Sequence, residues 1–157
     1  MLNVKQKSLR ADLCIFAQIW KMARIIAIDY GTKRTGIAVT DELQLIASGL
    51  TTVATKGLLS FLKEYFAKEK VEAMVIGEPK RMSGEASDVE EDIVRFRESV
   101  IKTFPSLTII RQDERFTSKM AFQTMIDSGI GKKKRQNKAL VDQISAAIIF
   151  RHYLHNK

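Results

Sequence analysis

Residues 24–40 read RIIAIDYGTKRTGIAVT, and this stretch decides the fold class. Residues 24–29 form an apolar, β-branched segment that predicts a strand, and the turn-like residues 30–34 follow it. Residues 35–40 then predict a second strand, so two strands with a five-residue connection indicate an antiparallel hairpin. Residues 45–53 predict a third strand, which extends the hairpin into a meander.

Apolar spacing changes after the third strand. A 3.6-residue period predicts a helix over 57–68, and residues 71–77 are typical of a buried strand. A glycine-containing loop over 78–85 precedes a second predicted helix with an apolar face that includes Val89 and Ile93. A helix after the meander therefore leads into a fourth strand and a further helix.

The remaining third of the chain repeats this alternation. Residues 107–112 predict a fifth strand, and a helix ends at about residue 127. A basic loop over 129–137 leads into a closing helix that carries Leu140 and Ile144. A meander followed by alternating helices and strands predicts an α/β fold: a mixed five-stranded sheet, with the last two strands parallel and helices on both faces.

Composition limits the classes of function. The 157 residues suit one domain, and 26 basic against 18 acidic residues give a net charge of +8, which favours a nucleic acid first and an anionic membrane second. The chain has one cysteine, which excludes an intramolecular disulfide and a cysteine-based zinc site. Its two histidines lie near the end of the chain, which disfavours a histidine-based catalytic triad. No apolar run is long enough for a membrane span, so we expect a cytoplasmic protein without membrane attachment.

Residues 1–21 form an N-terminal extension to a domain over 22–157. Leu9, Leu13 and Phe16 recur at helical spacing, which indicates a short amphipathic helix. The alternative is that Met22 is the natural start, because the first strong strand follows it directly. Neither interpretation changes the basic character of the domain.

Acidic residues occur where predicted strands end. Asp29 closes the first strand beside Gly31, and Asp113 and Glu114 follow the fifth strand, a position that often lines a site in open sheets. Both strand ends have a structural alternative, because Asp29 suits a turn and Asp113 or Thr117 suits a helix cap. Asp142 lies in the closing helix among small residues, which indicates a partly enclosed carboxylate; the alternative is an ordinary exposed helix residue.

Three carboxylates of this kind suit a hard cation. Mg²⁺ and related ions prefer oxygen ligands and need no histidine or cysteine. Phosphodiester cleavage by paired metal ions requires such an acidic cluster. The basic loop that precedes the closing helix would then lie near the same edge of the sheet and contact phosphates, unless it is simply a solvated run of charge.

Four segments, in order, resemble one known family. They are IAIDYGTKRTGIAV at 26–39, VIGEPKRMSGE at 75–85, RQDERFTS at 111–118 and KKKRQNKALVDQISAAIIFRHYL at 132–154. Together they are similar to the successive motifs of the YqgF/RuvX family, over about residues 22–154. The resemblance implies a ribonuclease H-like fold and kinship with Holliday-junction resolvases. It also implies a nuclease that acts in maturation of the 5′ end of pre-16S rRNA.

The resemblance also assigns roles to residues. It implies that Asp29, Glu114 and Asp142 are the catalytic acids and hold Mg²⁺ or Mn²⁺. It implies a cationic set that faces the nucleic acid, composed of Lys33, Arg34, Arg81, Arg115, Lys132, Lys133, Lys134 and Arg135. Ribosomal particles are further implied partners.

The chain departs from the family pattern at two places. Residues 1–21 have no counterpart, and Glu78 stands where the family usually has an apolar residue. Glu78 and Asp113 are therefore candidate supporting acids, and we expect neutralisation of Glu78 to have only a modest effect on catalysis.

Alternatives to this function follow from the same residues. The segment from Asp29 to Thr32 resembles the phosphate-binding hairpin of actin-like and sugar-kinase ATPases, but those enzymes need two such domains and this chain has neither the length nor the repeat. A non-catalytic RNA-binding module would have no reason to keep three repelling carboxylates among phosphates. The sequence leaves open whether the substrate is precursor rRNA or branched DNA, how it is cut, and whether the protein is a monomer or a homodimer.

Overall fold

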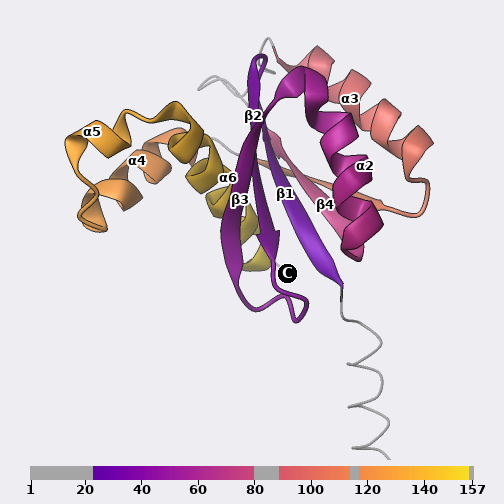
Figure 1. The fold of residues 1–157 in the computed structure, drawn as a ribbon, viewed down its shortest axis with the longest axis horizontal. Helices are drawn as coiled ribbons and strands as arrows, with labels where there is room; N and C mark the ends of the chain where they lie inside the picture. Colours follow the sequence, from indigo (N-terminus) through magenta and orange to yellow (C-terminus); the bar gives the residue numbers. More distant parts are fainter. Residues whose placement is uncertain (1–22, 80–88, 114–116, 156–157) are drawn as a thin grey trace, which may run out of the picture.

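A five-stranded sheet forms the centre of the computed structural model (Figure 1), which describes residues 23–79, 89–113 and 117–155. The elements in chain order are β1 (Arg24–Tyr30), β2 (Arg34–Thr40), β3 (Ala47–Ala54), η1 (Thr55–Gly57), α2 (Leu58–Lys68), β4 (Val71–Glu78), α3 (Glu90–Thr103), β5 (Thr108–Asp113), α4 (Thr117–Asp127), α5 (Lys132–Arg135) and α6 (Lys138–His155). Residues 1–21, which we interpreted as an extension, lie outside the described residues.

The strands lie in the order β3-β2-β1-β4-β5. β1 pairs antiparallel with β2, and β2 pairs antiparallel with β3, which is the predicted meander. β4 pairs parallel with β1, and β5 pairs parallel with β4. The mixed α/β sheet that the sequence predicts is therefore confirmed, with β1 at its centre.

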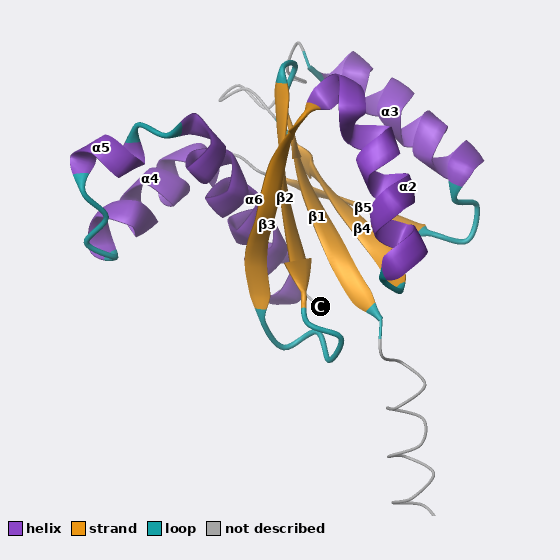
Figure 2. Cartoon of the chain, in the orientation of Figure 1, coloured by secondary structure: helices purple, strands orange, loops and turns teal. Residues whose placement is uncertain are grey.

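Each face of the sheet carries its own helical layer (Figure 2). One face packs Ile26 and Ile28 of β1 against α2 and α3, and the other packs Ile25 and Ala27 against α6. Side chains alternate along a strand, so the odd-numbered residues of β1 face α6 and the even-numbered residues face α2 and α3. The small side chains on the α6 face let this helix lie close to the sheet.

Two local details differ from the sequence predictions. The third strand begins at Ala47 rather than at residue 45, because the Asp41 carboxylate accepts hydrogen bonds from the backbone N–H groups of Leu45 (2.8 Å) and Ile46 (2.7 Å) and holds them in a loop. These backbone bonds also hold the pKa of Asp41 below its usual value. The predicted basic loop contains the short helix α5, which begins after Gly131.

Within the described part of the chain, the helices are all too short or too polar to span a lipid bilayer.

Candidate functional site

Asp29 lies near the end of the central strand, on the face that α6 covers. In the β1–β2 ladder its Cα is opposite that of Gly36, and directly opposed residues in an antiparallel pair point to the same face of the sheet. Their Cα atoms in such a pair are about 4.5–5.5 Å apart. Asp29 therefore has a residue without a side chain as its nearest neighbour on the α6 face.

Gly36 leaves room for the backbone of α6. A Cβ atom built at Gly36 would overlap the backbone carbonyl of Asp142 and touch its Cβ. α6 thus lies directly on β2 at this position, and Asp142 reaches the neighbourhood of Asp29 for that reason. The structure brings together two of the three acids that the sequence singled out.

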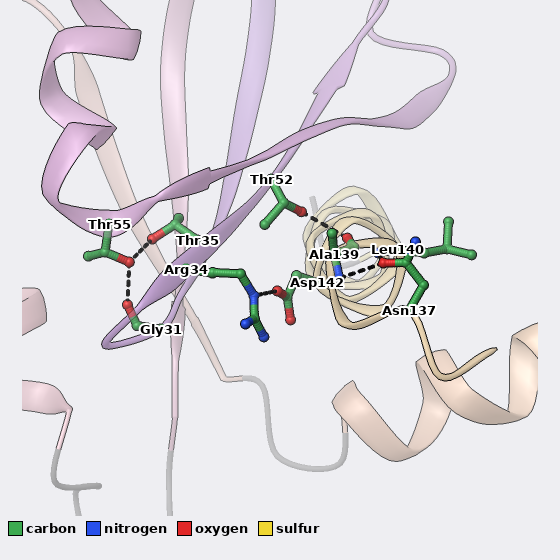
Figure 3. A network of polar contacts seen from close by, with 9 residues as sticks. All are labelled: Gly31, Arg34, Thr35, Thr52, Thr55, Asn137, Ala139, Leu140 and Asp142. Atoms are coloured by element: carbon green, nitrogen blue, oxygen red, sulfur yellow. Dashed lines mark hydrogen bonds and ion pairs between the residues drawn. The ribbon is translucent and has the colours of Figure 1, made fainter. Parts of the chain in front are cut away.

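Arg34 pairs with the second of these acids. Its Nε donates a hydrogen bond to Oδ2 of Asp142 at 3.1 Å, and the exposed fractions of the two side chains are 43% and 25% (Figure 3). Asp142 is therefore partly enclosed, as its small neighbours indicate. The ion pair offsets the negative charge of Asp142 next to Gly36, the ladder partner of Asp29.

The first turn of α6 is fixed by two side chains. Asn137 caps the helix, because its Oδ1 accepts hydrogen bonds from the N–H groups of Ala139 (3.0 Å) and Leu140 (3.3 Å). Thr52 of β3 donates from Oγ1 to the carbonyl of Ala139 at 2.8 Å (Figure 3). These contacts tie the segment before Asp142 to the sheet.

The turn between β1 and β2 is fixed in a similar way. Thr55 donates from Oγ1 to the carbonyl of Gly31 at 2.6 Å, and its hydroxyl lies 2.9 Å from that of Thr35 (Figure 3). The backbone N–H of Thr55 bonds the carbonyl of Lys33 at 3.1 Å. The turn that carries Lys33 and Arg34 is thus bound to the far end of β3, a role of Thr55 that the sequence did not reveal.

Tyr30 follows Asp29 but points to the opposite face. Its ring lies 5.4 Å from the ring of Phe96 of α3, measured between centroids. Burial raises the pKa of Tyr30 above its ordinary value, so the phenol is neutral at physiological pH and contributes no charge on the face opposite Asp29.

The two candidate supporting acids lie side by side on the other face of the sheet. Glu78 and Asp113 are Cα partners in the parallel β4–β5 ladder. Arg111, two residues before Asp113, pairs with Glu90 of α3 through two contacts of 2.9 Å, so alternation places Asp113 on the α3 face, and Glu78 with it. The face that carries Asp29 is the opposite one.

The predicted cationic residues fall into two described groups. Lys33 is exposed in the β1–β2 turn beside Arg34, and α5 carries Lys132, Lys133, Lys134 and Arg135, of which the three lysines are exposed. Arg81, Arg115 and the third candidate acid, Glu114, lie outside the described residues. Within residues 23–79, 89–113 and 117–155, no cluster of three or more acids, histidines and cysteines is arranged as a metal site.

A mixed five-stranded sheet in this order, with acids on its central strand and on the helix that covers it, defines a protein of the ribonuclease H-like class. The chain belongs to the RuvX family, whose model, described as a Holliday junction resolvase, matches residues 23–156. The family resemblance predicted from the four motifs is confirmed.

Three relatives agree with this assignment, and each is named "Putative pre-16S rRNA nuclease". The chain is similar to a protein of Flavobacterium johnsoniae, with 62% identity over 136 residues, or 87% of this chain and 99% of the relative. It is 58% identical to a protein of Bacteroides thetaiotaomicron over 136 residues, or 87% of this chain and 99% of the relative. It is 53% identical to a protein of Porphyromonas gingivalis over 135 residues, or 86% of this chain and 98% of the relative.

Proposed function

We propose that this protein is a metal-dependent nuclease that hydrolyses phosphodiester bonds in structured nucleic acid and processes the 5′ end of pre-16S rRNA. One observation carries the proposal: the contact at Gly36 brings Asp29 and Asp142 to one place on the sheet. Membership in the RuvX family and the names of the relatives point to the same chemistry and substrate.

The residues present fit a divalent cation, which we propose to be Mg²⁺ or Mn²⁺. Asp29 and Asp142 offer only oxygen donors, the kind that hard cations prefer. Glu114 is the proposed third carboxylate; it is the next residue in the sequence after Asp113, with which β5 ends. Divalent ions held by such a set supply the positive charge that activates an attacking water and stabilises the leaving oxygen.

The chain's own cations prepare this site for a polyanion. Arg34 restrains Asp142 through the 3.1 Å contact and leaves a partly exposed positive group beside this acid. Lys33 in the same turn adds a second cation. We propose that both bind phosphates next to the cleaved bond and that the cations of α5 bind phosphates farther along the strand.

Branched DNA is the second candidate substrate, because the matching family model is described as a Holliday junction resolvase. Resolution of a four-way junction requires two cuts, and therefore two copies of the site. The α5 cations and the paired acids suit a phosphodiester of either nucleic acid, so the substrate has to be compared directly.

Single-turnover cleavage tests the proposal. Purified protein is incubated with precursor 16S rRNA and with a four-way junction, in Mg²⁺ and in EDTA. Asp29→Asn, Glu114→Gln and Asp142→Asn should each lower the rate by orders of magnitude, since each removes a charge that positions the metal. Glu98→Gln, which neutralises an exposed acid on α3, is the matched control and should cleave normally.

The outcome separates three functions. Cleavage of the rRNA precursor supports the proposal, and preferential cleavage of the junction replaces it with the resolvase function. Binding of RNA without cleavage, by every variant alike, means a non-catalytic binding module. Undiminished cleavage in EDTA rejects the metal-dependent mechanism.

A further inference from the structure

Helix α4 has an outward apolar surface as well as a buried one. Ala121 and Met125 are fully buried, whereas Met120, Phe122 and Ile126 have exposed fractions of 40%, 49% and 40%. Phe122 is the aromatic residue among them, and exposed apolar side chains that are grouped on one helix indicate a binding surface more strongly than those that are scattered singly.

The surroundings of this ring are strongly cationic. The Arg135 guanidinium carbon lies over the Phe122 ring, 5.6 Å from the centroid. Between residues 117 and 141 the chain has six lysines and arginines against one acid, Asp127. Lys132, Lys133 and Lys134, which directly precede Arg135, are all exposed.

This surface lies close to the candidate site along the chain. Asn137 links α5 to α6, and Asp142 is four residues into α6, about 6 Å along its axis from Lys138 at 1.5 Å per residue. Figure 2 shows α4 and α5 extending away from the sheet on the side of α6. The end of α6 that follows α5 is therefore the end that carries Asp142.

We propose that Phe122 and the cations of α5 form a binding site for an unpaired nucleic-acid strand. The Phe122 ring stacks against a base, and the lysines of α5 bind the phosphates on either side of it. A base within a duplex is already stacked on both faces, so a ring of this kind favours single-stranded substrate. This inference rests on the proposed nuclease function and specifies that the substrate reaches the acids through an unpaired segment.

Binding measurements in EDTA test the site without cleavage. The probes are a short, fluorescein-labelled adenine-rich single-stranded RNA and a blunt RNA duplex with the same number of phosphates. Phe122→Leu should weaken binding of the single strand about tenfold, because one stacked base is lost, and should leave duplex binding unchanged. Phe122→Trp should keep single-strand affinity at or above that of the wild type.

A matched variant controls for loss of an exposed apolar group. Ile101 of α3 is 45% exposed, and Ile101→Ala should change binding of neither probe. The salt dependence provides a second readout: Phe122→Leu removes no phosphate contact, so the slope of log K against log salt should equal that of the wild type.

The possible outcomes are distinguishable from those of the nuclease test. Equal weakening of both probes by Phe122→Leu, or an effect on neither, overturns the stacking site and leaves α4 as a surface for a protein. If the wild-type protein cleaves its substrate and Phe122→Leu binds both probes as the wild type does, only the stacking site is rejected. Single-strand binding that depends on Phe122 in a protein that never cleaves rejects the proposed nuclease function alone.

Discussion

Gly36 of β2 and Asp142 of α6 are in direct contact: the space that a side chain at position 36 would fill holds the backbone of residue 142. Because Gly36 is also the ladder partner of Asp29, this one contact sets the separation of the two described candidate acids. The site therefore depends on the absence of a side chain as much as on the carboxylates themselves.

Gly36→Ala tests this dependence. The added methyl group overlaps the Asp142 carbonyl, so α6 must shift away from β2, and we expect a destabilisation of about 1–3 kcal/mol, typical of overpacking. Urea unfolding measures the loss. Gly57→Ala is the control, because nothing lies within 4 Å of a Cβ at Gly57; its stability should be unchanged or slightly higher. Equal stability of Gly36→Ala and wild type would show that α6 does not rest on β2 here.

Arg34→Gln should affect metal and nucleic acid in opposite directions. Removing the cation that pairs with Asp142 lowers repulsion of a divalent ion, and we expect Mn²⁺ to bind about fivefold more tightly, on a charge interaction of about 1 kcal/mol. Binding of RNA should weaken, since a phosphate contact is lost. Calorimetry with Mn²⁺ and anisotropy with RNA in EDTA measure the two effects.

Lys33→Gln is the control for that variant, because Lys33 is an exposed cation in the adjacent turn, whereas the ion pair to Asp142 comes from Arg34. It should weaken RNA binding while leaving Mn²⁺ affinity close to that of the wild type. If both variants change Mn²⁺ affinity equally, the Arg34–Asp142 pair has no special role in the metal site.

The cations of α5 should dominate the salt dependence of binding. Replacing Lys132, Lys133, Lys134 and Arg135 together with alanine removes up to four phosphate contacts. The magnitude of the slope of log K against log salt should then fall by about three to four units, because each phosphate that is no longer contacted keeps its counterions. A slope equal to that of the wild type would mean that α5 is only solvated.

Glu78→Gln should have a small effect on cleavage. Glu78 pairs in register with Asp113 on the α3 face, whereas Asp29 is on the α6 face, so it is poorly placed to hold the same cation. Removal of an acid that supports a metal ligand typically lowers activity by about 10- to 100-fold. For Glu78→Gln we expect the cleavage rate to fall by about tenfold or less. Single-turnover rates at saturating Mg²⁺ decide this, and a loss as large as that of Asp29→Asn would place Glu78 in the metal site.

Sheet topology could be predicted from the sequence because it depends on local patterns. Ile26 and Ile28 alternate in packing with Ile25 and Ala27, and the short connection predicted after Asp29, which is residues 31–33 in the structure, permits only a hairpin. The partial enclosure of Asp142 could also be predicted, since small residues follow it on the helix. These features require knowledge of neighbouring residues alone.

The contacts that build the site could not be predicted in this way. Glycine within a strand indicates a close backbone approach but does not identify the approaching segment, so Gly36 gave no sign of its contact with Asp142. Arg34 and Asp142 are 108 residues apart, and their pairing follows from the position of α6 on the sheet. The role of Thr55 was hidden for the same reason, because Gly31 and Thr35 meet it only after β3 has formed.

The division of the site between β1 and α6 has a consequence for the synthesis of the protein. Translation delivers Asp29 early, but Asp142 is made only after all five strands, and Gly36 has no helix to contact until then. Because chains emerge from the ribosome in N- to C-terminal order, a growing polypeptide lacks the assembled pair of acids for most of its production. The proposed enzyme would therefore be inactive during its own synthesis, next to the translated mRNA and the ribosomal RNA. It would become able to cleave RNA only when α6 packs against the sheet.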